Sequence, residues 1–137
     1  MICLFVITEK MIKKEYTINA KANAVFAALT TKSSVEKWTG TSAEMSDKEG
    51  SEFSLWDGSI IGQNVEVSPS RIIQKWKESS WEKHSDVVFK IREYGESTKL
   101  ILEHDNIPEA SLQSIDNGWD EYYLGPLKSY VESIQSN

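Results

Sequence analysis

Residues 106–132 of the chain read NIPEASLQSIDNGWDEYYLGPLKSYVE. Within and just beyond this run, apolar side chains recur at intervals of three and four residues, at Leu112, Ile115, Trp119, Tyr122, Tyr123, Leu127, Tyr130, Val131 and Ile134. This spacing predicts one long amphipathic helix near the end of the chain. Its apolar stripe is rich in Trp N–H and Tyr O–H groups, so it suits the wall of a cavity as well as a dry core.

The N-terminal third predicts one strand followed by two helices. Residues 12–19 alternate as a strand does, and the alanine-rich residues 20–29 have helical spacing. A second, short helix is predicted over residues 34–38, and Gly40 can end it.

Residues 41–105 predict six further short strands, separated by turn sequences such as the tight-hairpin signal Asp57-Gly58. Spacings this short leave no room for crossover helices, so we expect the sheet to be antiparallel. The prediction is an α+β, helix-grip architecture: a curved sheet of about seven strands around a long C-terminal helix, with two short helices after the first strand. A sheet that curls around one helix commonly leaves space at either end of that helix, and we expect a cavity there.

Composition and charge argue against several kinds of partner and location. The 137-residue chain has a formal net charge of −6 and an isoelectric point near 5.0, so nucleic acid is not an expected partner. The single cysteine, Cys3, can form no disulfide within the chain, which predicts a reducing, cytoplasmic location. The apolar run at the N-terminus is too short for a secretion signal or a membrane span. We expect residues 1–10 to be an N-terminal extension and residues 11–137 to form a single domain.

Several short strings follow one another in an order and spacing typical of a known family. They are residues 24–30 (AVFAALT), Trp38-Thr39, residues 53–58 (FSLWDG), Gly62, Lys75-Trp76, Ser80-Trp81, His84, Asn106-Ile107-Pro108, Gly118-Trp119, Tyr122-Tyr123 and Pro126-Leu127-Lys128. Together, over about residues 12–134, the chain resembles the activator of heat-shock protein 90 ATPase homologue family, a branch of the START-like, helix-grip (SRPBCC) superfamily.

The resemblance implies a helix-grip fold with an apolar cavity, and a heat-shock protein 90-type chaperone as partner. It points to the C-terminal domain of the eukaryotic co-chaperone that stimulates the chaperone's ATPase. That co-chaperone also has a separate N-terminal domain, for which 137 residues leave no space. The resemblance therefore implies more about shape than about activity.

Catalytic and metal chemistry have little support in the sequence. His84 lies in a polar connection between strands and is expected to face solvent. His104 ends a strand in phase with Leu102, so it is either a hydrogen-bonded structural residue or a pocket group. Glu103, His104 and Asp105 point to alternating sides of a strand and cannot converge on one metal ion. Since zinc, phosphate-loop and dinucleotide motifs are also missing from the sequence, we predict no catalytic residue, metal or cofactor.

Binding has better support, because five tryptophans are spread over different predicted elements. Gln63 is in phase with Ile61, Val65 and Val67, which we predict to form the inner face of a strand. A polar group on that face needs either a structural neighbour or a ligand that it orients. The predicted pocket residues are Trp56, Gln63, Trp76, Phe89, Leu102, His104, Trp119, Tyr122 and Tyr123.

Three classes of function remain open at the level of sequence. The first is a non-catalytic binding domain with an aromatic-lined cavity for a small apolar or lipid-like molecule, coupled to a chaperone or to stress. The second is a small-molecule enzyme that uses the same cavity, as cyclases and aromatases of the superfamily do. The third is a protein-interaction module whose cavity is filled. A cavity without converging titratable groups favours the first class, and a filled one favours the third.

Overall fold

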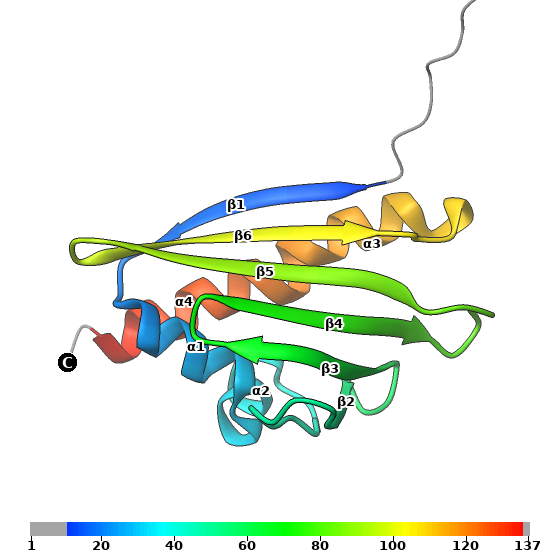
Figure 1. The fold of residues 1–137 in the computed structure, drawn as a ribbon, viewed down its shortest axis with the longest axis horizontal. Coiled ribbons are helices and arrows are strands. Elements are labelled where there is room, and N and C mark those ends of the chain that lie inside the picture. Colours follow the sequence, from blue (N-terminus) through cyan, green and yellow to red (C-terminus); the bar gives the residue numbers. More distant parts are fainter. Residues whose placement is uncertain (1–10, 136–137) are drawn as a thin grey trace, which may run out of the picture.

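The computed structural model describes residues 11–135, which form a six-stranded sheet with helices packed on one of its faces (Figure 1). The elements are β1 (Ile12–Ile18), α1 (Ala22–Thr30), α2 (Lys32–Thr39), β2 (Glu52–Leu55), β3 (Ile60–Ser68), β4 (Arg71–Glu78), β5 (Ser85–Tyr94), β6 (Ser97–Asp105), α3 (Leu112–Gly118) and α4 (Gly125–Gln135). The proposed extension, residues 1–10, lies outside the described residues.

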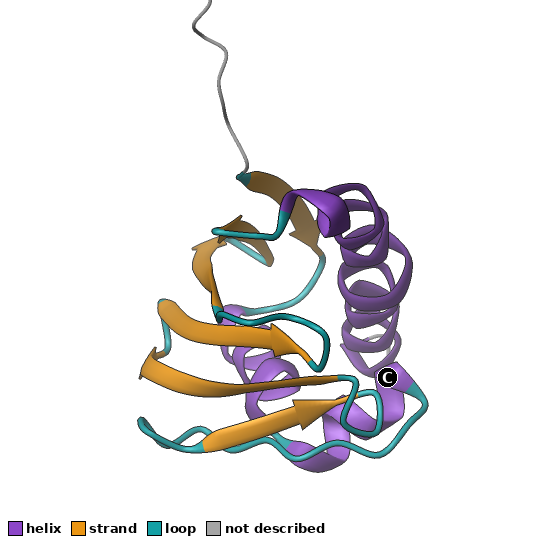
Figure 2. Cartoon of the chain, turned by 90° about the vertical axis from the view of Figure 1, so that its right-hand side faces the viewer, coloured by secondary structure: helices purple, strands orange, loops and turns teal. Residues whose placement is uncertain are grey.

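The sheet is antiparallel throughout, in the order β1-β6-β5-β4-β3-β2. Figure 2 shows the sheet as one layer and the helices as the other, which is the predicted helix-grip arrangement. Alternating residues of the central strands, such as Val87, Phe89 and Ile91 of β5, are buried against the helices. None of the helices between residues 11 and 135 has the length and apolar character needed to cross a membrane.

The strand count differs from the prediction by one. Between α2 and β2, where a strand was expected, Glu44 pairs with Ser54 only as an isolated bridge. The chain turns immediately afterwards, through Asp47-Lys48-Glu49-Gly50, and Gly50 has a φ of +85°. A segment that bends after so few residues cannot extend a ladder, so the sheet has six strands instead of about seven.

The predicted C-terminal helix is present but is not uniformly α-helical. A π-helical segment, Trp119–Leu124, connects α3 to α4. Because a π-turn holds more residues than an α-turn, it rotates the following residues relative to the helix face. Tyr123 and Leu124 are consequently buried, whereas Tyr122, which the periodicity placed on the buried stripe, is 59% exposed. A Cβ atom on Gly125 would lie only 2.5 Å from the Asp120 carbonyl oxygen, so this turn requires glycine there.

Gln63 corrects the prediction for β3. It lies on the outer face of the sheet, is exposed, and donates from Nε2 to the Gly50 carbonyl oxygen at 3.2 Å. Ile61 and Val65, which were predicted to share the inner face with Gln63, are exposed as well, at 45% and 46%, so the prediction had the wrong face for all three. A β-bulge between Asn64 and Glu66 shifts the alternation only for the residues that follow. Val67 therefore packs against the core while Gln63 faces away from it, although residues four apart in a regular strand share one face.

The buried polar residue of β3 is Asn64. Its Nδ2 donates to the Ser46 carbonyl oxygen at 3.2 Å and to Ser51 Oγ at 3.1 Å. Its Oδ1 accepts from Gln74 Nε2 at 2.9 Å, and Gln74 Oε1 accepts from the indole of Trp76 at 2.7 Å. This chain of hydrogen bonds satisfies the polar groups on the inner face.

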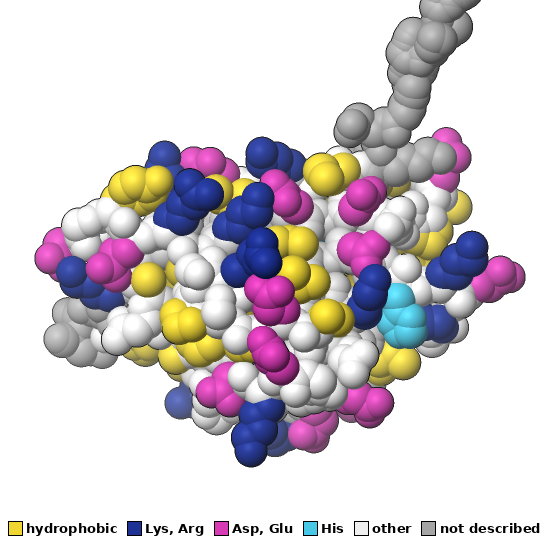
Figure 3. Space-filling model, viewed as in Figure 1, with side chains coloured by type: hydrophobic (Ala, Val, Ile, Leu, Met, Phe, Trp, Pro, Cys, Tyr) yellow, Lys and Arg dark blue, Asp and Glu magenta, His cyan; other side chains and the backbone are white. Residues whose placement is uncertain are grey.

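The outer face of the sheet is open and charged (Figure 3). Acidic and basic side chains are interspersed on it and form cross-strand ion pairs, for example Arg71 with Glu66 at 3.0 Å and Lys99 with Glu15 at 3.4 Å. Such exposed pairs contribute little stability, about 0–1 kcal/mol each. The fold is therefore stabilised mainly on the inner face, which also bears the candidate site.

Candidate functional site

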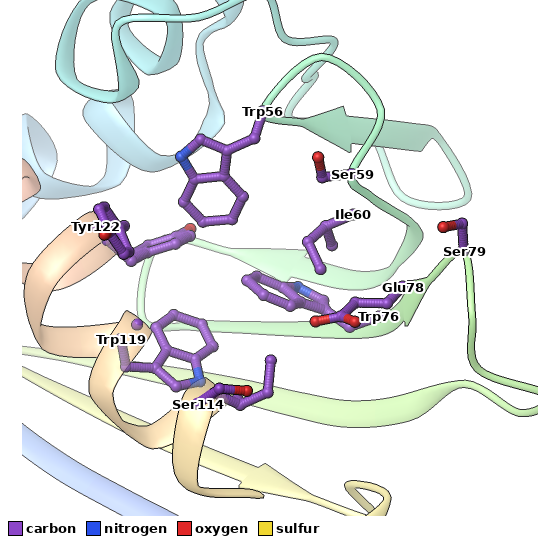
Figure 4. A pocket seen from close by; sticks show the side chains of 12 residues that line it. Trp56, Ser59, Ile60, Trp76, Glu78, Ser79, Ser114, Trp119 and Tyr122 are labelled. Atoms are coloured by element: carbon purple, nitrogen blue, oxygen red, sulfur yellow. The ribbon is translucent and has the colours of Figure 1, made fainter. Parts of the chain in front are cut away.

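An open pocket of about 610 Å³ lies where the β2–β3 hairpin, the end of β4 and the C-terminal helix meet (Figure 4). Its lining comes from all three elements: Trp56, Ser59, Ile60, Trp76, Glu78, Ser79, Ser114, Ile115, Gly118, Trp119, Tyr122 and Tyr123. This is one end of the helix that the sheet grips, where the sequence predicted space. The volume suits a small organic molecule.

The β2–β3 hairpin holds Trp56 over the pocket in an unusual backbone conformation. Trp56 and Asp57 have φ values of +50° and +57°, and Gly58 follows at +92°. A bulky residue in this left-handed region is strained, and such strain clusters at binding sites. The hairpin thereby brings the Trp56 ring to 6.5 Å from Trp76 and 6.2 Å from Tyr123, between ring centroids.

A packed aromatic cluster forms the inner wall of the pocket. Trp76 and Trp119 stack with their centroids 4.7 Å apart and their planes at 28°. Tyr123 lies 4.6 Å from Trp119 and stacks on Phe89 at 5.6 Å. These rings occupy the space between the sheet and the middle of the helix, so the pocket opens at the end of the grip instead of lying enclosed within it.

His104 supports this wall from behind. It is buried, and the Nε1–H of Trp119 donates to its Nδ1 at 2.9 Å. Its Nε2 lies 2.7 Å from Ser85 Oγ, and the Ser85 hydroxyl donates to the Trp76 carbonyl oxygen at 3.1 Å. Because an indole nitrogen can only donate, Nδ1 must be the acceptor, which assigns the proton to Nε2. Of the two alternatives for His104, the structure shows the hydrogen-bonded structural residue.

The protonation state of His104 follows from the same surroundings. Burial lowers the pKa of His104 to about 3, and the only opposing influence is the distant charge of Asp86. A second proton would have to bind at Nδ1, where it would point at the Trp119 N–H and find no acceptor. His104 is therefore neutral at physiological pH and fixes the orientation of Trp119.

Tyr123 brings an unpartnered hydroxyl to the pocket. The residue is 1% exposed, and burial raises the pKa of its phenol. Every fully buried side-chain polar atom of residues 11–135 has a hydrogen-bond partner, whereas the Tyr123 hydroxyl has none in that part of the chain. The little exposed surface that Tyr123 keeps must therefore include its oxygen, and the pocket that Tyr123 lines is where that oxygen can meet a ligand or water.

Glu78 is the single charged residue among those that line the described pocket. It lies at the end of β4, directly opposite Ile60 in the β3–β4 register, and it is two residues beyond Trp76, so both side chains are on the pocket side of the strand (Figure 4). The side chain is partly buried and has no hydrogen-bond or ion-pair partner within residues 11–135. Rim hydroxyls come from Ser59, Ser79 and Ser114.

Five of the nine predicted pocket residues line this pocket: Trp56, Trp76, Trp119, Tyr122 and Tyr123. Phe89, Leu102 and His104 are buried behind its wall, and Gln63 is on the opposite face of the sheet. The sequence analysis did not nominate Ile60 or Glu78 as pocket residues. The Asp57-Gly58 turn could have identified Ile60, because it places that residue at the start of the next strand. Glu78 carried no sequence signal of its own. His84 is exposed in the β4–β5 connection, as expected.

The comparisons with known proteins agree with this architecture. A profile of the family described as "Activator of Hsp90 ATPase homolog 1-like protein" matches residues 19–132. The chain is 25% identical over 116 residues to activator of 90 kDa heat shock protein ATPase homolog 2 of Mus musculus, covering 82% of this chain and 35% of that protein. It is 31% identical over 104 residues to the activator of 90 kDa heat shock protein ATPase homolog of Dictyostelium discoideum, covering 71% of this chain and 27% of that protein.

A solved structure covers nearly the whole chain. The crystal structure of an HSP90 activator from Plasmodium falciparum superposes with a TM-score of 0.81 at 29% identity, covering 92% of this chain and 96% of that one. By contrast, the chain spans only about a third of the length of the curated relatives it matches. Because the family profile matches most of its length, the chain belongs to the Activator of Hsp90 ATPase homolog 1-like family.

Proposed function

We propose that this chain is a non-catalytic binding domain whose pocket takes a small, flat, largely apolar molecule with one hydrogen-bonding group. The observation that carries the proposal is the Tyr123 hydroxyl, which keeps some exposed surface on an otherwise buried residue, has no partner within residues 11–135, and borders a pocket walled by indole rings. A ligand that bonds to this hydroxyl would restore a hydrogen bond that the fold leaves unmade. The indole and phenol rings among the lining residues favour an apolar, aromatic partner.

The placement of the titratable groups supports binding over catalysis. His84 is exposed in a loop, and His104 is held neutral behind the wall by Trp119 and Ser85. The lining described here offers one carboxylate, Glu78, without a second acid or base beside it. A weak nucleophile needs an adjacent base to activate it, and neither histidine reaches this lining, which makes the cyclase- or aromatase-like alternative the weaker one.

Titration with N-phenyl-1-naphthylamine, a flat neutral molecule with one N–H group, tests the proposal. We expect saturable binding to one site, read from the fluorescence of the probe and the quenching of tryptophan. Tyr123→Phe keeps the ring and removes a hydroxyl that has no protein partner, so stability should hold while affinity falls about threefold to tenfold. Affinity for 1-phenylnaphthalene, which lacks the N–H group, should not change. Equal affinities of wild type and Tyr123→Phe for the first probe would contradict the assignment of Tyr123.

Regulation of a heat-shock protein 90-type chaperone ATPase is a second proposed function, favoured by the family and by the names of the relatives from Mus musculus and Plasmodium falciparum. The chain corresponds to about a third of the curated relatives, so their full activity does not transfer automatically. The test is ATP hydrolysis by the chaperone of the same organism, measured with and without equimolar chain. We expect a changed rate; an unchanged rate together with no binding by calorimetry would contradict this role.

A further inference from the structure

The chemistry of the pocket lining selects between neutral, anionic and cationic ligands. Trp76 and Trp119 direct their N–H groups away from the pocket, to Gln74 Oε1 and His104 Nδ1. Toward the pocket these residues therefore present the carbon surfaces of their rings. Trp76 and Trp119 stack on each other and are 3% and 2% exposed, so Trp56, which is only partly buried, offers the larger ring surface to a ligand. The electron-rich face of an indole attracts a cation, quaternary ammonium groups included.

Glu78 adds a negative charge to the same space. It lines the pocket from the same face of β4 as Trp76 (Figure 4), and its carboxylate has no ion-pair partner among residues 11–135. The nearest basic side chain in the sequence, Lys77, bonds to the backbone carbonyl oxygen of Glu78 at 3.5 Å and not to its carboxylate. Other surface carboxylates of this fold, such as Glu66 and Glu103, pair with Arg or Lys. Glu78 is one of several carboxylates of residues 11–135 without an ion pair, and it is the one that lines the pocket.

The lining described for this pocket includes Glu78 but neither Lys nor Arg. A bound cation would gain from both the rings and the carboxylate, whereas a bound anion would face an unpaired like charge across a partly desolvated space. The formal net charge of −6 adds a long-range field of the same sign. Each of these features favours a positive ligand independently of the others.

We propose that the pocket binds an organic cation, an alkylated or aromatic amine whose charged group lies between the tryptophan rings and the Glu78 carboxylate. This inference rests on the proposed binding function and names its ligand class. The apolar body of such an amine would contact Ile60 and Ile115, which also line the pocket. Trp56, held over the site by its strained hairpin, would cover the cation.

The test uses two probes of the same shape and different charge: phenyltrimethylammonium and its neutral carbon isostere, tert-butylbenzene. Both are titrated at low ionic strength against the full chain, with tryptophan fluorescence as the readout. We expect the cation to bind about tenfold or more tightly than the isostere. Glu78→Gln should lower affinity for the cation about tenfold and leave the isostere unchanged. Glu82→Gln, an exposed carboxylate outside the pocket, is the matched control and should change neither.

A second variant separates the rings from the carboxylate. Trp56→Leu keeps an apolar side chain and removes the π face, so it should weaken the cation several-fold more than the isostere. Thermal melts confirm that each variant is folded. Equal affinities for cation and isostere, or a Glu78→Gln variant that binds the cation as well as wild type does, would overturn the cation inference while leaving a binding pocket. Saturable binding of neither probe would overturn the cation inference alone if N-phenyl-1-naphthylamine still binds, and would overturn the proposed binding function as well if that probe also fails to bind.

Discussion

The indole nitrogen of Trp119 donates to Nδ1 of His104 at 2.9 Å, linking the C-terminal helix to β6 inside the core. This bond orients a ring that stacks on Trp76 and forms the inner wall of the pocket. Stability and the shape of the site therefore depend on the same contact. Substitution of either residue should therefore change the stability of the fold.

Trp119→Ala should destabilise the fold by about 3–5 kcal/mol, the usual cost of deleting a buried large aromatic side chain. Trp119 is 2% exposed, and its loss would also leave His104 Nδ1 without a donor. The neighbouring Tyr122, which is 59% exposed, provides the control, and Tyr122→Ala should cost less than about 1 kcal/mol. Denaturant unfolding measures both. Similar midpoints for the two variants would mean that the helix phase described here is wrong.

His104 makes stability depend on pH below neutrality. Its pKa is about 3 in the fold, against about 6.5 in an unfolded chain, so the unfolded state binds more protons between these values. Stability contributed by neutral His104 is therefore complete above pH 6.5 and is lost as the pH falls, by up to about 1.4 kcal/mol per pH unit. His104→Gln cannot titrate and should be about 1–3 kcal/mol less stable at pH 7.

The measurement is urea unfolding of wild type and His104→Gln at pH 7, 6 and 5. The difference between the two proteins isolates His104 from the carboxylates that also titrate in acid. We expect the gap to narrow steadily as the pH falls. A gap that stays constant with pH would show that His104 is not buried and neutral.

Adjacent substitutions in β3 test which face of the strand is buried. Gln63→Leu changes an exposed outer-face side chain and should alter stability by less than about 0.5 kcal/mol. Asn64→Leu removes the donor to Ser46 and Ser51 and the acceptor of Gln74, and should cost about 2–4 kcal/mol. Thermal melts of the two variants suffice. A larger loss for Gln63→Leu than for Asn64→Leu would restore the inner-face prediction for Gln63.

Tyr16 ties the edge strand β1 to the π-helical segment. Its hydroxyl donates to Asp120 Oδ1 at 2.6 Å, and burial together with this carboxylate raises the pKa of Tyr16 to about 12. The stability gained is present below pH 10 and is lost as the pH rises through 12. Tyr16→Phe should cost about 1 kcal/mol at pH 7 and remove a phenol that ionises near pH 12 in an ultraviolet titration. An unchanged titration curve would contradict the bond.

Much of the fold could be predicted from local pattern. The period-2 run Val87, Phe89 and Ile91 and the hairpin signal Asp57-Gly58 each depend on neighbouring residues only, and both were confirmed. The π-helical segment moved Tyr122 out of the buried stripe. Gln63 was placed on the wrong face because its apolar neighbours Ile61 and Val65 indicated an inner face, whereas both are exposed and the bulge after Asn64 turns only Val67 toward the core.

The site was harder to predict than the fold for a related reason. Aromatic residues such as Trp76 and Trp119 could be nominated one by one, because large amphipathic rings commonly line pockets. Glu78 could not be nominated in this way. Its importance depends on its lack of a partner within the described residues and on its pairing with Ile60 of the neighbouring strand β3. Such properties belong to the tertiary arrangement and have no local sequence signal.

Gly118 offers the most direct test of the pocket as a binding site. It lies on the helix against the pocket, and a Cβ atom there would meet only the Tyr122 ring, at 3.9 Å. Gly118→Leu should therefore fill the pocket while keeping or raising stability, since glycine costs a helix about 0.5–1 kcal/mol relative to alanine. Asn117→Leu, an exposed neighbour outside the lining, is the matched control.

The decisive measurement is the dissociation constant of N-phenyl-1-naphthylamine for wild type, Gly118→Leu and Asn117→Leu, with thermal melts of all three. We predict saturable one-site binding to wild type and to Asn117→Leu, and at least tenfold weaker binding to a Gly118→Leu variant that melts no lower than wild type. Equal binding by all three proteins would place the probe elsewhere and contradict the account of this pocket as the binding site.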